Sequence, residues 1–108
     1  MVFVFRVDLH WLSPEEGGRS RPVHADRYTP TARFTGEQEQ FSVVMEFPKN
    51  AGINPETGTL RLLNLELASI QGRIRPHVAL EIMEGERVVA ECVVESAASG
   101  MKIGAGSS

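Results

Sequence analysis

The chain has 108 residues and a formal net charge of −3, so it is long enough for one compact domain with its own core but not for two. Hydrophobic residues make up 42% and charged residues 23%, as in ordinary soluble proteins, and no strong field directs the chain to nucleic acid or an anionic membrane. The single cysteine, Cys92, excludes an intramolecular disulfide and a zinc site built from cysteines.

Membrane and nucleotide partners are also not expected. No apolar run approaches the roughly 20 residues of a membrane-spanning helix. Arg6 and Asp8 interrupt the N-terminal apolar segment too early for a signal peptide. The chain has no Gly-x-x-x-x-Gly-Lys-Ser/Thr loop of the kind that holds nucleotide phosphates. We therefore expect a cytoplasmic protein with no membrane and no nucleotide as partner.

The first segment is predicted to be a half-buried strand because its apolar residues recur at every second position. One face carries Phe3, Phe5, Val7, Leu9 and Trp11. Residues 13–18 then contain a proline and two adjacent glycines, Gly17 and Gly18, which can adopt the positive φ of a short hairpin. We expect a hairpin here, with its returning strand at residues 19–24.

Four segments in the middle of the chain are also predicted to be strands or loops. Residues 31–35 and 41–47 are expected to be strands, the second with a clear alternation of apolar and polar residues. Residues 48–58 contain two prolines and two glycines and are expected to form a surface loop. Residues 60–67 are predicted to be a strand whose leucines at every second position, from Leu63 onwards, share one face.

The C-terminal part predicts a second hairpin. Residues 78–82 and 88–95 alternate on either side of the turn 84–87, with Ala90, Cys92 and Val94 on one face. The connector 68–76 carries no sustained 3.6-residue apolar period, so no helix is expected there. Residues 1–96 are assigned to the folded domain and residues 97–108 to a disordered tail. Six or seven short strands without a helix are typical of a small β-barrel or a sandwich.

Two stretches resemble the third, C-terminal domain of translation elongation factor Tu. The turn 16–19, Glu-Gly-Gly-Arg, matches that domain's first hairpin, and Pro22, Tyr28 and Pro30 match prolines and the tyrosine that follow it. The segment 82–89, Ile-Met-Glu-Gly-Glu-Arg-Val-Val, is similar to the domain's closing hairpin. The resemblance implies an all-β fold, a single small antiparallel barrel of six or seven strands, as a free-standing relative without the GTPase domain.

The best candidate for a binding surface is the arginine-rich segment between residues 19 and 33, which holds only one acid, Asp26. Arginine is well suited to bidentate contacts with carboxylate or phosphate, although a high-GC genome would explain the same bias. An exposed aromatic among arginines can stack and bind phosphate, or it can simply cap the barrel. The candidate partner-binding residues are Arg19, Arg21, His24, Arg27, Tyr28 and Arg33.

Catalytic, cofactor and metal sites are not expected. The three histidines, His10, His24 and His77, lack the spacing of a metal site. Neighbouring carboxylates on a turn, as at residues 15–16, are usually solvated. Cys92 is expected to be a buried, inert thiol, and Trp11 is expected to pack in the core rather than serve as a stacking platform. Arg19 and Arg87 are each expected to pair with the glutamate of their own turn.

The function expected from these features is that of a noncatalytic binding module. A protein partner or RNA would bind the surface from Arg19 to Arg33, and a protein is preferred because the whole chain is acidic and has few aromatic residues. The alternative is a structural homo-oligomer that self-associates through an exposed sheet edge without a nucleic-acid ligand. An enzyme would need a pocket with convergent polar groups, which no motif of the sequence indicates.

Overall fold

The structure is a computed structural model that describes residues 3–64 and 68–97. These residues contain seven strands, the 3₁₀ turn Pro14–Glu16 and one short helix, α1 (Ala68–Gln71). The strands are β1 (Phe5–Trp11), β2 (Arg27–Tyr28), β3 (Thr31–Phe34), β4 (Phe41–Glu46), β5 (Thr57–Leu62), β6 (Ala79–Glu84) and β7 (Arg87–Ala97). Neither helical segment of the described residues is long and apolar enough to cross a membrane.

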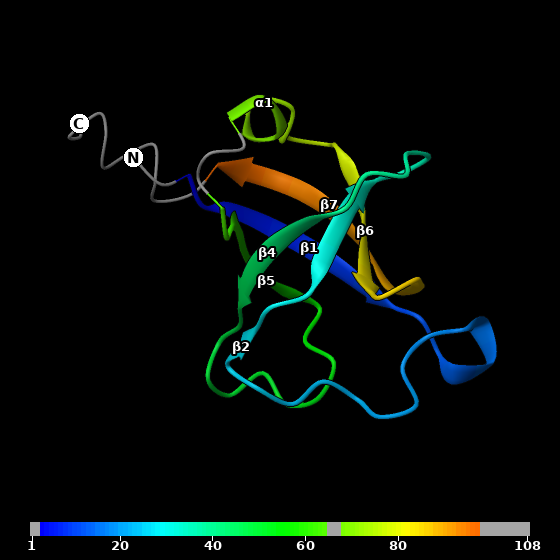
Figure 1. The fold of residues 1–108 in the computed structure, drawn as a ribbon. Helices are drawn as coiled ribbons and strands as arrows, with labels where there is room; N and C mark the ends of the chain where they lie inside the picture. Colours follow the sequence, from blue (N-terminus) through cyan, green and yellow to red (C-terminus); the bar gives the residue numbers. More distant parts are fainter. Residues whose placement is uncertain (1–2, 65–67, 98–108) are drawn as a thin grey trace.

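The strands form a closed antiparallel barrel (Figure 1). Their order is β4-β3-β6-β7-β1-β5, and pairing of β5 with β4 completes the circle. β2 and β3 follow one another along the same edge of β4, and Thr29 and Pro30 separate them. Proline has no N–H for a ladder, so Pro30 breaks what would be one long strand while its carbonyl still accepts from Val43 N–H at 3.0 Å. The predicted all-β fold, a small antiparallel barrel, is confirmed.

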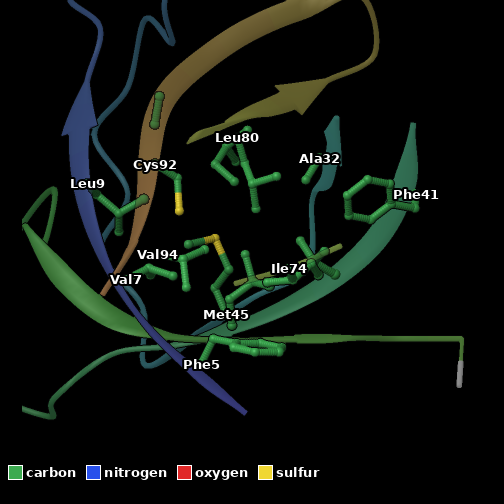
Figure 2. Packing of buried hydrophobic residues seen from close by; sticks show 14 of the residues in the cluster. Phe5, Val7, Leu9, Ala32, Phe41, Met45, Ile74, Leu80, Cys92 and Val94 are labelled. Carbon is green, nitrogen blue, oxygen red and sulfur yellow. The ribbon is translucent and has the colours of Figure 1, made fainter. Parts of the chain in front are cut away.

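The core follows from the alternation along the strands. In β1, Phe5, Val7 and Leu9 are buried, while Arg6 and Asp8 between them are exposed. Figure 2 shows side chains of β1, β3, β4, β6 and β7 pointing into one interior. Full burial of one such side chain contributes roughly 1.5–3 kcal/mol, so the alternation fixes which face of each strand is inside.

Bulges adjust this alternation where the barrel curves. The register of β6 against β7 shifts between Ile82 and Met83, and both side chains are buried although they are neighbours in sequence. The register of β1 against β7 also shifts, between Arg6 and Val7, which leaves Glu95 of β7 without an opposite residue. Bulges increase local twist, which a sheet needs in order to close into a barrel of this size.

The first predicted hairpin is wrong. Residues 19–24 form no strand, and residues 14–16 form a 3₁₀ turn in place of a tight hairpin turn. The physical reason is the pattern of the expected returning arm, in which only Val23 is a buried apolar residue. The burial of an apolar face fixes the register of a strand, so a segment without such a face is not held in the sheet.

The second correction concerns the leucine-rich segment. β5 covers Thr57–Leu62 rather than residues 60–67, and it buries Leu60 and Leu62. Leu63, predicted to share the apolar face, is 52% exposed, and residues 65–67 lie outside the described residues. The connector after them holds α1, which was not expected, and Ile70 from this helix joins the core.

The remaining expected elements are present. β3, β4, β6 and β7 confirm the strands predicted at residues 31–35, 41–47, 78–82 and 88–95 to within a few residues. The last strand, β7, ends at Ala97, and the domain boundary after residue 96 stays a prediction. The rest of the predicted tail, residues 98–108, lies outside the described residues.

Candidate binding site at one end of the barrel

Three connections meet at the end of the barrel opposite α1 (Figure 1). The longest joins β1 to β2 and covers residues 12–26; we call it the strap. The second is the loop between β4 and β5, residues 47–56, and the third is the turn between β6 and β7. The predicted site residues between Arg19 and Tyr28 all lie on the strap or on β2, directly after it.

A capping box fixes the beginning of the strap. The Oγ of Ser13 accepts from the Glu16 N–H at 3.2 Å, and the Glu16 carboxylate accepts from the Ser13 N–H at 2.8 Å. These hydrogen bonds favour the ionised form, so they lower the pKa of Glu16 below its ordinary value. Gly17 ends the turn in the left-handed region at φ 95°, which glycine adopts without steric cost.

Two arginines connect the strap to the β6–β7 turn. Arg19 Nε lies 2.9 Å from the carboxylate of Glu84, and Arg87 donates to the carbonyl of Gly18 at 3.1 Å. The expectation that each arginine pairs within its own turn is therefore wrong. Each reaches the other turn, because the 3₁₀ geometry places residues 18 and 19 against the barrel rather than out in a free hairpin.

Asn54 holds the middle of the strap. Its side-chain oxygen accepts from the Val23 N–H at 2.9 Å, and its backbone N–H donates to the Val23 carbonyl at 2.8 Å. Asn54 adopts φ 46°, a conformation that asparagine tolerates better than most residues. Sequence reasoning missed this residue, since a lone asparagine in a loop indicates only a turn.

Tyr28 and Trp11 close this end of the barrel. Their ring centroids are 6.0 Å apart, and the guanidinium of Arg19 lies 5.9 Å from the Tyr28 centroid. The Tyr28 hydroxyl donates to Glu84. Burial first, and this hydrogen bond second, raise the pKa of Tyr28 above its ordinary value of 10.0. Tyr28 is thus half-buried. Of the two interpretations of this residue, this agrees with an aromatic that caps the barrel rather than with an exposed stacking platform.

Trp11 is likewise held by packing. Its ring meets Phe47 edge-on with the centroids 6.4 Å apart, and its Nε1 donates to the Pro55 carbonyl at 2.6 Å. A buried indole N–H needs such an acceptor, so the hydrogen bond fixes the ring against the 47–56 loop. The structure therefore supports the core-packing interpretation of Trp11.

A cavity of about 330 Å³ lies between the strap and the barrel. Trp11, Leu12, Pro22 and Val89 provide apolar walls, and Arg19 and Arg21 contribute the positive charges. Because a cavity of this kind combines an apolar surface with a few charged groups, it can hold a small amphipathic group and orient it.

The structure separates the six predicted site residues into two groups. Arg19 is neutralised by Glu84, and Arg33 lies on the barrel wall in a 2.6 Å ion pair with Glu81 of the neighbouring strand. Tyr28 is engaged as described above. The exposed side chains of Arg21, His24 and Arg27 make no hydrogen bond or ion pair within the part of the chain that the structure describes. We call these three residues the cationic segment.

Other candidate chemistry is located elsewhere or is structural. No group of three or more His, Cys, Asp or Glu side chains within residues 3–64 and 68–97 is arranged to hold a metal ion. Cys92 is fully buried, and burial raises the pKa of its thiol to about 12. Because the thiolate is the reactive form, this agrees with the predicted inert thiol.

No protein-family model matches the chain, and no curated protein matches it. The resemblance to the third domain of elongation factor Tu therefore stays a prediction that depends on the two turn segments and on Pro22, Tyr28 and Pro30.

Proposed function

We propose that this protein is a noncatalytic cytoplasmic binding module that holds a protein partner through the cationic segment Arg21, His24 and Arg27. The observation that supports the proposal is that some arginines form ion pairs within the chain and others do not. Arg19 and Arg33 are occupied by glutamates, whereas the cationic segment is exposed and without internal partners in the described chain, next to a cavity. Exposed arginines of this kind are available for bidentate contacts with carboxylates.

A protein fits the surroundings of the cationic segment better than RNA does. An RNA strand presents phosphates at regular intervals and is bound by a continuous positive groove. Here Asp26 precedes Arg27, and Glu46 lies directly opposite it on β4. With a net charge of −3 for the whole chain, the surface alternates in sign, as in a protein–protein contact steered by complementary charges.

A relation to a translation elongation factor domain forms part of this proposal. Its support is the closing hairpin around residues 84–87 and the antiparallel barrel that the resemblance implies, whereas the turn 16–19 matches in sequence but forms no hairpin. The chain departs from the family at Arg27 and Thr29, which lie on β2 and just after it. We infer that a partner specific to this protein binds where these departures lie.

The test is affinity capture with the immobilised protein in an extract of its native cells, with both proteins and RNA identified. The double variant Arg21→Ala and Arg27→Ala should lose the captured protein. The control variant, Arg75→Ala, removes an exposed arginine near α1 and should retain it. Equal capture by both variants would contradict the proposed surface. RNA binding that weakens steeply with salt would assign the surface to nucleic acid.

Homo-oligomerisation through a sheet edge is the alternative, and the closed barrel leaves little edge for it. Among the described strands only β2 pairs on a single side, and it has two residues. An edge this short offers few hydrogen bonds to a second copy. Light scattering over a wide concentration range should therefore show a monomer; a dimer that Arg27→Pro disrupts would support the alternative.

A further inference from the structure

We propose that the cavity beneath the strap is a pocket for the C-terminal residue of the partner protein, which places an apolar side chain and the terminal carboxylate there together. This inference depends on the proposed function and names the part of the partner that is recognised. The pocket is formed by Trp11, Leu12, Pro22 and Val89 as apolar walls, with Arg21 as the free charge.

The size of the cavity favours one residue. Its volume of about 330 Å³ lies at the small end of ligand pockets, which typically span roughly 300–1,000 Å³. Its apolar wall includes Trp11 and Pro22, which are stiff groups that lose little entropy when they are covered. A single aliphatic or aromatic side chain would therefore gain burial without reordering the protein, as anchor residues do in protein interfaces.

The charges around the cavity favour one carboxylate. Arg19 is already shared with Glu84, which leaves Arg21 as the cation without a partner in the described chain. Ser20 and Arg21 both line the cavity, and their backbone N–H groups have no acceptor within the described residues. An arginine with adjacent free N–H groups is a typical receptor for a terminal carboxylate.

Glu16 sets an upper limit on the negative charge that the cavity accepts. Its carboxylate also lines the cavity, and the capping box with Ser13 holds it in the ionised form. A dianionic phosphate beside this carboxylate would meet repulsion that one free arginine cannot offset. A single carboxylate is therefore the better match.

The joint presence of apolar walls and a carboxylate receptor distinguishes a chain end from an internal segment. Neighbouring side chains of an extended peptide point in opposite directions, and side chains on the same face are two residues, about 7 Å, apart. An apolar group and an acid of an internal segment therefore reach a small cavity only from separate positions. The last residue of a chain has its side chain and its carboxylate on the same Cα atom, so it places both groups in the cavity together.

Trp11 allows a direct test, since it is the only tryptophan and lines the cavity. The full-length protein is titrated with the pentapeptide Gly-Ser-Gly-Ser-Leu with a free carboxylate, and separately with the same peptide ending in an amide. We expect Trp11 emission to change with both peptides and the acid to bind about tenfold more tightly, equivalent to ~1.4 kcal/mol. Equal affinities for acid and amide, or no change in emission with either, would overturn the inference.

Substitutions at Arg21 test whether this residue produces the preference for the acid peptide over the amide. Arg21→Ala should bind acid and amide equally, while Arg75→Ala should retain the tenfold preference. A circular dichroism spectrum like that of the parent protein shows that each variant is folded, and Arg21→Lys should restore part of the preference because it restores the charge. Persistence of the full preference in Arg21→Ala would overturn the assignment of Arg21. A uridine oligonucleotide that displaces the acid peptide would assign the cavity to phosphate and also overturn it.

Failure of this inference is separable from failure of the proposed function. If neither peptide binds but the double variant Arg21→Ala and Arg27→Ala still loses its captured partner, the binding module stands and the chain-end pocket is rejected. If the acid peptide binds as expected but the captured protein is indifferent to both substitutions, the cavity binds a chain end, but the proposed surface and the assignment of the cavity to that partner are both rejected.

Discussion

The two Glu-Gly turns of this protein have almost the same sequence and different structures. Residues 84–87, Glu-Gly-Glu-Arg, form a two-residue hairpin turn between β6 and β7. Residues 16–19, Glu-Gly-Gly-Arg, end a 3₁₀ turn with a capping box and lead into a segment without a strand. The turn residues alone therefore do not specify a hairpin, which also needs two arms with an apolar face to bury.

The glycines of the two turns also have different roles. Gly85 has φ 63° and open space where a Cβ would lie, so its requirement is conformational. At Gly18 a Cβ would lie 2.2 Å from the Leu12 carbonyl oxygen, so its requirement is the close approach of two backbone segments. The first turn is pressed against the barrel, and the second extends from it. Substitutions at these positions measure that difference.

The largest effect is expected for Gly18→Ala. The new Cβ would overlap backbone atoms of Leu12 that cannot move without displacing the end of β1, so we expect a loss of roughly 3 kcal/mol in the free energy of unfolding. Urea denaturation measures this change. The control is Gly36→Ala, at φ 89° with open space, where only the conformational cost of about 1–2 kcal/mol applies. Equal losses at the two positions would contradict the close approach.

A smaller effect is expected for Gly85→Ala. Alanine at positive φ costs about 1–2 kcal/mol, whereas asparagine tolerates this region, so Gly85→Asn should lose clearly less than Gly85→Ala. The difference between the two variants in the free energy of unfolding isolates the backbone conformation. If both are equally destabilised, a contact rather than φ limits this position.

The third prediction concerns the contact between the turns. Glu84→Ala should lower the pKa of Tyr28 by removing its hydrogen bond, while burial keeps that pKa above 10.0. Arg19→Ala should raise the pKa of Tyr28, because the positive charge of Arg19 favours the phenolate. Ultraviolet titration can follow the change, since Tyr28 is the only tyrosine.

The same pair of variants measures the Arg19–Glu84 ion pair. A double-mutant cycle should give a coupling of roughly 0–1 kcal/mol, as expected for a partly exposed pair. Shifts of the Tyr28 pKa in the same direction for both variants would show that the two turns do not meet at Tyr28.

The parts of the fold that the sequence predicts are those with local patterns. β6 and β7 alternate on both sides of their turn, so the hairpin could be assigned without knowledge of its neighbours. The strap could not, because its contacts join residues far apart: Val23 and Asn54 are 31 positions apart. Such hydrogen bonds depend on barrel closure, which places the 47–56 loop beside the strap.

The error in β5 has a similar cause. Residues 60–67 allow two phases of leucines at every second position, one beginning at Leu60 and one at Leu63. Pairing decides between them, because Leu60 lies opposite Phe5 of β1 and Leu62 lies opposite Val43 of β4.

The candidate site also depends on contacts between residues far apart in the sequence. The sequence predicts six candidate residues in one segment, but only the distant glutamates Glu81 and Glu84 distinguish occupied arginines from free ones.

The smallest expected effect lies in the capping box of the first turn, which the hairpin turn lacks. Because the pKa of Glu16 is lowered from 4.5 in the folded state, its ionised carboxylate stabilises the fold above pH 4.5. This contribution is lost as the pH falls below 4.5 and through the lower folded pKa. The stability of Glu16→Gln should therefore approach that of the parent protein as the solution is acidified from pH 7 to 3.

Urea unfolding at each pH provides the measurement. Glutamine can still accept from the Ser13 N–H, so the variant removes the charge and keeps the turn. Glu15→Gln is the matched control, since it removes the same charge one residue away from the capping box. A gap between Glu16→Gln and the parent that stays constant from pH 7 to 3 would mean that the ionised carboxylate does not hold the turn. The first turn would then depend on its uncharged hydrogen bonds and on the close approach at Gly18, which the Gly18→Ala variant measures independently.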